Sequence, residues 1–87
     1  MPRYIIKESF WKVDFKIQSF CSINEYFLIC GDIKGKLIII DIKTGHPMVL
    51  NISHDSIVTE IRQDLHGNIW SAGKDGKLYV FPINSLL

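Results

Sequence analysis

The 87-residue sequence predicts an all-β domain built from two similar units, the second of which is incomplete. Two observations carry this prediction. Short apolar runs rich in Ile and aromatic residues are bounded by Gly, Asp, Asn and Pro, as is typical of β-strands, and no stretch has the 3.6-residue apolar period of a helix. The tripeptide Gly-Lys-Leu occurs at 35–37 and again at 76–78, so the chain repeats a turn and a strand. We call the step from position 35 to position 76 the repeat offset.

Each expected strand is an apolar or β-branched run that ends near a turn-forming residue. In the first unit these runs are Tyr4–Ile6, Val13–Phe20, Tyr26–Cys30, Lys36–Ile42 and Pro47–Ile52. In the second unit they are Ile57–Arg62, Ile69–Ala72 and Lys77–Ile83, and no run follows that could be a fourth strand. Leu37–Ile40 is apolar without alternation, which predicts an inner strand buried on both faces.

Two of the connections are expected to be hairpin turns, at 32–35 and at 74–76. Gly35 and Gly76 can adopt the positive φ that the twist of paired strands requires. The two turns stand at equivalent places in the repeat, which supports the division of the chain into two units.

A shift of the sequence by the repeat offset pairs apolar positions with apolar positions over most of its length. The paired positions are Ile17 with Val58, Phe20 with Ile61, Leu37 with Leu78, Ile39 with Val80, Ile40 with Phe81 and Ile42 with Ile83, while Cys30 falls on Ser71. A period of about 40 residues made of short strands is the signature of a propeller blade. We therefore expect a single partial propeller over 1–87, with a first blade and a leading strand in 1–52 and an incomplete second blade in 53–87.

The second unit resembles the WD-repeat family. Ser71–Phe81 is similar to the family pattern of Ser, then Asp-Gly, then a strand that ends in Trp-Asp, and His54 stands where the family has the His that opens a blade. The first unit ends in Ile40-Asp41, which keeps the Asp of the Trp-Asp pair and lacks the Trp. The resemblance covers nearly the whole chain and implies two WD-type β-propeller blades.

A narrower resemblance links the chain to the first blades of the fungal ASTRA-associated WD-repeat proteins, whose animal relatives are described as G-protein-β-like. It covers CGDIKGKLIIIDIKTGHPMVL, the Ser53-His54 opening and GKDGKLYVF. The matching positions are Gly31, Asp32, Asp41, Pro47, His54, Gly73, Asp75 and Lys77–Val80. The chain departs from the pattern at Gly45-His46, where the family has paired arginines, and it lacks both tryptophans of the pattern. The resemblance implies a nuclear assembly connected with chromatin remodelling and with the maturation of phosphatidylinositol-kinase-like proteins.

Ser71, His54 and Asp75 are the residue types of a Ser–His–Asp catalytic triad, so a small hydrolase is one alternative. The WD-type resemblance implies a different role, in which the three side chains form a structural hydrogen-bond cluster inside the second blade. Buried polar groups need such partners. We expect the structural role and no catalysis.

Other chemistry finds little support in the sequence. The net charge of +1 gives no electrostatic reason to expect nucleic acid or an anionic membrane as a partner. The run from Gly31 to Leu37 is one residue too short for a phosphate-binding loop, and Leu37 cannot bind magnesium, so we expect no cofactor. We also expect no metal site, because the candidate ligands lack the spacing of known sites; these ligands are Cys21, Cys30, His46, His54 and His66.

The function expected from these observations is a non-catalytic scaffold subunit with protein partners and no small-molecule substrate. A WD-repeat adaptor of a complex other than ASTRA is the alternative within the same class. The chain has no signal-peptide pattern, which indicates an intracellular protein. Because blades pack face to face, the end faces should be apolar and should favour self-association or completion by further blades. The apolar positions expected on these faces are Ile17, Phe20, Ile38 and Tyr79.

Overall fold

A computed structural model describes residues 10 and 12–85, and its regular structure there is almost entirely β. The strands are β1 (Ile17–Ser22), β2 (Phe27–Asp32), β3 (Lys36–Asp41), β4 (Pro47–Ser53), β5 (Val58–Gln63), β6 (Asn68–Gly73) and β7 (Leu78–Pro82). A three-residue 3-10 helix, η1 (Ile83–Ser85), follows β7. None of the described residues belongs to a helix long and apolar enough to cross a membrane. The prediction of an all-β chain is confirmed.

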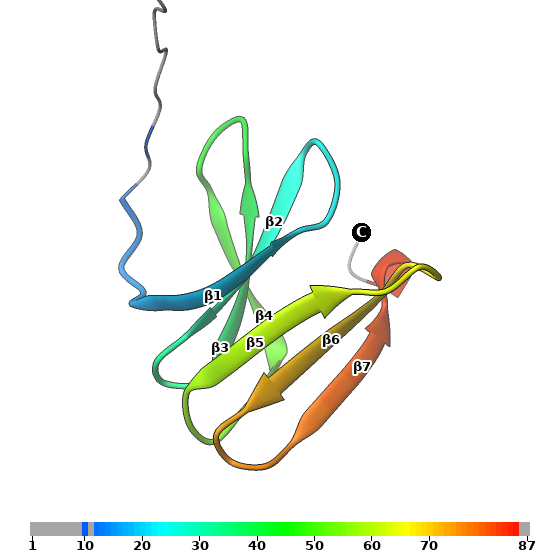
Figure 1. Cartoon of the computed structure of the whole chain (residues 1–87). Helices are drawn as coiled ribbons and strands as arrows, with labels where there is room; N and C mark the ends of the chain where they lie inside the picture. The colour runs from blue at the N-terminus through cyan, green and yellow to red at the C-terminus, as the bar shows by residue number, and fades with distance from the viewer. Residues whose placement is uncertain (1–9, 11, 86–87) are drawn as a thin grey trace, which may run out of the picture.

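The strands form two antiparallel sheets, one for each of the expected units (Figure 1). The first sheet has the order β1-β2-β3-β4, and the second has the order β5-β6-β7. As the sequence predicted, β3 is an inner strand, and Leu37–Ile40 is buried throughout. β7 is the last strand of its sheet and has no strand on its outer edge in the described part of the chain.

The pairing of the strands repeats with the same offset as the sequence. Each pair of residues that lie opposite each other in β1 and β2 has its counterpart, one repeat offset later, in β5 and β6. The same holds for β2 with β3 and for β6 with β7. The β-bulge between Ile17 and Ser19 recurs between Val58 and Glu60. The backbone bond from the Ile33 N–H to the Lys16 carbonyl also has its counterpart, from Lys74 to Ile57. The repeat is therefore a repeat of hydrogen-bond register, although few side chains are identical.

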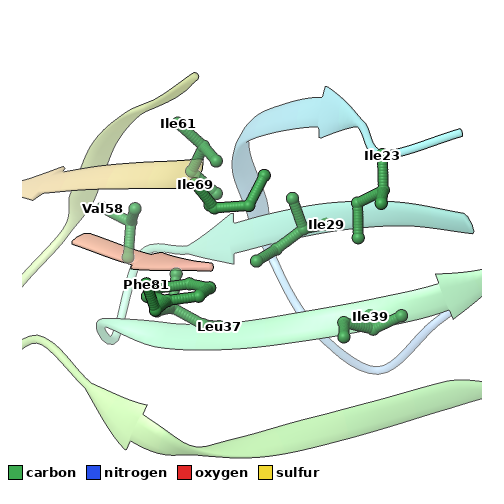
Figure 2. Close-up of a cluster of buried hydrophobic side chains, with 8 residues drawn as sticks. All are labelled: Ile23, Ile29, Leu37, Ile39, Val58, Ile61, Ile69 and Phe81. Atoms are coloured by element: carbon green, nitrogen blue, oxygen red, sulfur yellow. The ribbon is translucent and has the colours of Figure 1, made fainter. Parts of the chain in front are cut away.

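The main core lies between the two sheets, where β5 contacts β1 and β2. Figure 2 shows its buried members, Ile23, Ile29, Leu37 and Ile39 from the first unit and Val58, Ile61, Ile69 and Phe81 from the second. The sheets approach closely at Gly31, where an added Cβ would overlap the Val58 side chain. The Ser19 hydroxyl donates a hydrogen bond of 2.9 Å to the Val58 carbonyl and so links the two sheets at the same place.

A smaller apolar cluster covers the opposite face of the first sheet. Cys30, Ile38 and Ile40 are buried there. Val13 and Phe15, which precede β1, pack against them, and the Lys36 ammonium lies 5.6 Å from the centre of the Phe15 ring. The first sheet is thus apolar on both faces.

Most expected strand boundaries in the described part of the chain lie within two residues of the observed ones, and two differences have a clear structural reason. The strand expected at Val13–Phe20 begins at Ile17, because Val13 and Phe15 fold over the face of the sheet instead of joining its edge. The strand expected at Lys77–Ile83 ends at Pro82, and Ile83 begins η1. The expected strand Tyr4–Ile6 lies outside the described residues.

The two hairpin glycines offer a matched pair of substitutions. Gly35 and Gly76 have φ values of +95° and +82°, so alanine at either position is strained, typically by about 1–2 kcal/mol. A Cβ on Gly35 would also collide with the backbone carbonyl of His54, whereas a Cβ on Gly76 meets nothing within 4 Å. We expect Gly35→Ala to lower the free energy of unfolding by about 1–3 kcal/mol more than Gly76→Ala. Urea denaturation of both variants measures this difference, and equal losses would show that the contact between Gly35 and His54 is absent.

Candidate functional site

The structure brings His54, Ser71 and Asp75 together between the start of the second unit and its hairpin. His54 lies in the connection from β4 to β5, Ser71 in β6, and Asp75 in the turn from β6 to β7. The His54 Nε2 atom is 2.9 Å from the Ser71 Oγ, and its Nδ1 atom is 3.1 Å from the Asp75 Oδ1. These are the three side chains expected to form a cluster, and we call them the His54 cluster.

The chemistry of the partners decides the tautomer of the histidine. An ionised carboxylate only accepts hydrogen bonds, so Nδ1 carries the proton and donates it to Asp75. In the neutral ring Nε2 then accepts the hydrogen bond from the Ser71 hydroxyl. Asp75 also accepts bonds from the backbone N–H groups of Asp55, at 2.8 Å, and Lys77, at 3.0 Å. The bond from Asp55, followed by those from Lys77 and His54, lowers the pKa of Asp75 to about 2, so its carboxylate is ionised at neutral pH.

Burial limits what the His54 cluster can do. The order Ser–His–Asp and its distances match a catalytic triad, but Ser71 is 0% exposed and His54 is 2% exposed. A substrate carbonyl must reach the serine oxygen before a triad can act, and here that oxygen is enclosed by the sheet. The Tyr79 ring packs edge-on against the His54 ring, with the centroids 4.9 Å apart, and covers it further. In the described part of the chain every buried side-chain nitrogen or oxygen has a hydrogen-bond partner.

The first unit has an apolar version of the same cluster. The positions one repeat offset before His54, Ser71 and Tyr79 are Val13, Cys30 and Ile38. These three residues also pack together, in the smaller apolar cluster on the first sheet. The repeat therefore keeps the place of the cluster and changes its chemistry. Burial raises the pKa of the Cys30 thiol to about 11, so this cysteine is a neutral core residue.

The second sheet presents an open, largely apolar surface on the side away from the first sheet. Cross-strand register places its members on one face, which we call the outer face of the second sheet: Glu60, Arg62, Trp70, Ala72, Leu78 and Val80. Trp70, Leu78 and Val80 are 38%, 60% and 47% exposed. A depression of about 350 Å³ lies over this face, and its wall includes Trp70 and Leu78.

A neighbouring turn fixes the orientation of Trp70. Asp64 accepts a hydrogen bond of 2.9 Å from the indole Nε1–H and two more of 2.9 Å from the backbone N–H groups of His66 and Asn68. The bond from Trp70, followed by those from Asn68 and His66, holds the pKa of Asp64 well below its ordinary value. The hydrogen bond to Asp64 thus restrains the indole of a side chain that is 38% exposed.

The sequence placed some of these residues correctly and others not. The expectation that Ile38 and Tyr79 lie on open end faces is wrong, because Ile38 is completely buried and Tyr79 is half-buried against His54. Ile17 and Phe20 are exposed as expected, Phe20 by 67%. The role of Asp64 was missed, although its Asp-x-x-Gly spacing to Gly67 is a turn signature.

No metal-binding group of three or more His, Cys, Asp or Glu side chains is present among the described residues. Cys21 and Cys30 are free thiols. The hairpin glycines have the positive φ on which the turn assignment was based.

Comparisons with known proteins give a structural likeness. No protein-family model matches the chain, and no curated protein matches it. Among solved structures, the chain is similar to the crystal structure of the computationally designed Ika4 protein, with a TM-score of 0.64 and 25% sequence identity over 77% of this chain. The match spans 41% of the designed chain, so this chain corresponds to about two fifths of it.

His54→Ala tests whether the His54 cluster stabilises the second sheet. Loss of the imidazole leaves the buried Ser71 hydroxyl without its partner, so we expect the free energy of unfolding to fall by about 1–3 kcal/mol. His66→Ala is the control, because His66 is exposed and contributes only its backbone N–H to the turn at Asp64. Chemical denaturation followed by Trp fluorescence gives both values. An unchanged midpoint for His54→Ala would show that the cluster does not hold the sheet.

Proposed function

We propose that the two sheets are consecutive WD-type propeller blades and that the chain is a non-catalytic scaffold for protein partners. The observation that carries the proposal is the repeated strand register, with the bulge and the hairpin glycine at the same place in each sheet. Face-to-face packing of successive small antiparallel sheets is how a propeller is built. The His54 cluster adds the polar pattern of a WD-type blade to the second sheet.

The enclosure of the His54 cluster favours a structural over a catalytic role. Ser71 is fully buried, and each polar atom of the cluster is satisfied by another part of the same sheet or its turns. Catalysis needs a reactive oxygen within reach of substrate and donors aimed at the developing charge. A buried network that is fully satisfied instead fixes a single packing arrangement.

The proposed setting is the ASTRA assembly of the nucleus, on the strength of the narrower family resemblance. The residues that carry it include Gly31, at the contact between the sheets, and Asp32, whose carboxylate accepts two backbone N–H bonds in the β2–β3 turn. The rims of the sheets, formed by such turns, are rigid surfaces suited to recognition. An adaptor role in another complex is the alternative.

Affinity purification tests the setting. The chain carrying an epitope tag, expressed in fungal cells, is expected to concentrate in the nucleus and to co-purify with ASTRA subunits well above a tagged β-protein of the same size. ASTRA subunits at the level of that control would remove this setting and leave the adaptor alternative.

A fluorophosphonate reagent, which labels activated serine hydroxyls, tests the absence of catalysis separately. We expect no labelling of Ser71 in the folded chain, with Ser71→Ala as the blank. Stoichiometric labelling at Ser71 would contradict the scaffold proposal and favour a hydrolase.

A further inference from the structure

Each sheet has an outer face that corresponds, by the repeat, to a face used in the contact between the sheets. The outer face of the second sheet is open, and that of the first is partly covered by Val13 and Phe15. The face of the first sheet that packs on the second carries Ile29, Leu37 and Ile39, all of them buried. The positions one repeat offset later are Trp70, Leu78 and Val80. These lie on the outer face of the second sheet, are also apolar and are open to solvent. The outer face of the second sheet therefore corresponds to the face through which the first sheet packs on the second.

The other half of the contact is repeated as well. The second sheet packs on the first through Val58, Ile61 and Phe81. Their counterparts in the first sheet are Ile17, Phe20 and Ile40. We call the side of the first sheet that faces away from the second sheet the outer face of the first sheet. Phe20 lies on this face, in a row of residues that are neighbours across the strands: Phe20, Cys30, Ile38 and Val49. Phe20 and Val49 in this row are large and exposed.

We propose that the chain associates with copies of itself head to tail, the outer face of the second sheet of one copy packing on the outer face of the first sheet of the next. Each such contact would reproduce the packing of the two sheets inside one copy. A head-to-tail contact between different faces extends to a ring if the rotation closes and to a filament if it does not. The inference rests on the register of the strands and does not depend on the proposed ASTRA setting.

The segment that covers part of the outer face of the first sheet does not block this contact. Val13 and Phe15 lie over Cys30 and Ile40. Their repeat counterparts are His54 and Ser56, and His54 lies over Ser71 on the face of the second sheet that packs on the first. A segment in this position is therefore compatible with a docked sheet.

At one position the sheets must lie farther apart in the contact between copies than in the contact within a copy. Val58 packs directly on Gly31, where a Cβ would collide. The counterpart pair between copies is the second copy's Ile17 on Ala72, and both side chains are larger. The second copy must sit farther out at this end of the sheet, so we expect the contact between copies to be weaker than the one within the chain.

Two single substitutions separate the two faces. Leu78→Glu places a charge on the outer face of the second sheet, and Phe20→Glu places one on the outer face of the first. Both positions are well exposed, so the fold should be kept, which circular dichroism verifies. Leu65→Glu is the control, because Leu65 is fully exposed in the β5–β6 turn and lies on neither face.

Light scattering and native mass spectrometry over a dilution series give the outcome. Wild type and Leu65→Glu are expected to assemble into several copies, and each of the two face variants alone is expected to remain at the 10.0-kDa mass of one copy. Mixing Leu78→Glu with Phe20→Glu should restore one intact contact and give a 1:1 dimer, since each variant keeps the face that the other has lost.

Three results would overturn the proposal. A wild-type chain that stays monomeric at all concentrations shows that the outer faces do not dock. Assembly of Phe20→Glu alone shows that identical faces pack on each other. Two folded variants that remain separate when mixed show that the outer faces of the two sheets are not partners.

Discussion

The apolar contact between the two sheets is the interaction on which the rest of the structure depends. A small antiparallel sheet with one apolar face is marginal in water unless that face is covered, and here each sheet covers the other. Val58 packs on Gly31 within this contact, and the Ser19 hydroxyl donates to the Val58 carbonyl beside it. The backbone N–H of His54 donates to the Gly35 carbonyl at 2.8 Å, so the contact also fixes where the second unit begins. The same connection places the His54 side chain beside Ser71 and Asp75.

The repeat shows that strand register can be kept while the chemistry of the side chains changes. The two units share their pairings, their bulge and their hairpin glycine, and yet Val13 and Cys30 replace His54 and Ser71. An apolar pair and a fully satisfied polar pair both solve the problem of filling the same space. The proposed scaffold role is consistent with this arrangement, because every polar group of the cluster is used in hydrogen bonds that hold the sheet.

Sequence patterns predicted the features that depend on neighbouring residues. The hairpin at Gly35, the buried run Leu37–Ile40 and the offset of the repeat can all be read locally, since turn chemistry and apolar period act over a few residues. The partners within the His54 cluster came from a family resemblance instead. The side chains that cover Ile38 could not be predicted, because they are Val13 and Phe15, from a segment that looks like a strand in the sequence. The bond from Trp70 to Asp64 joins two strands through their turn, and only the pairing of β5 with β6 brings the two residues together.

The most direct test of the packing between the sheets is a nuclear Overhauser measurement on the isotope-labelled chain. A strong cross-peak is expected between the Gly31 Hα protons and the Val58 methyl protons, since the Val58 side chain packs directly on that glycine. The peak must persist on dilution, because the contact lies within one copy. Two formed sheets with their hairpin signals intact and no Gly31–Val58 cross-peak would contradict the account.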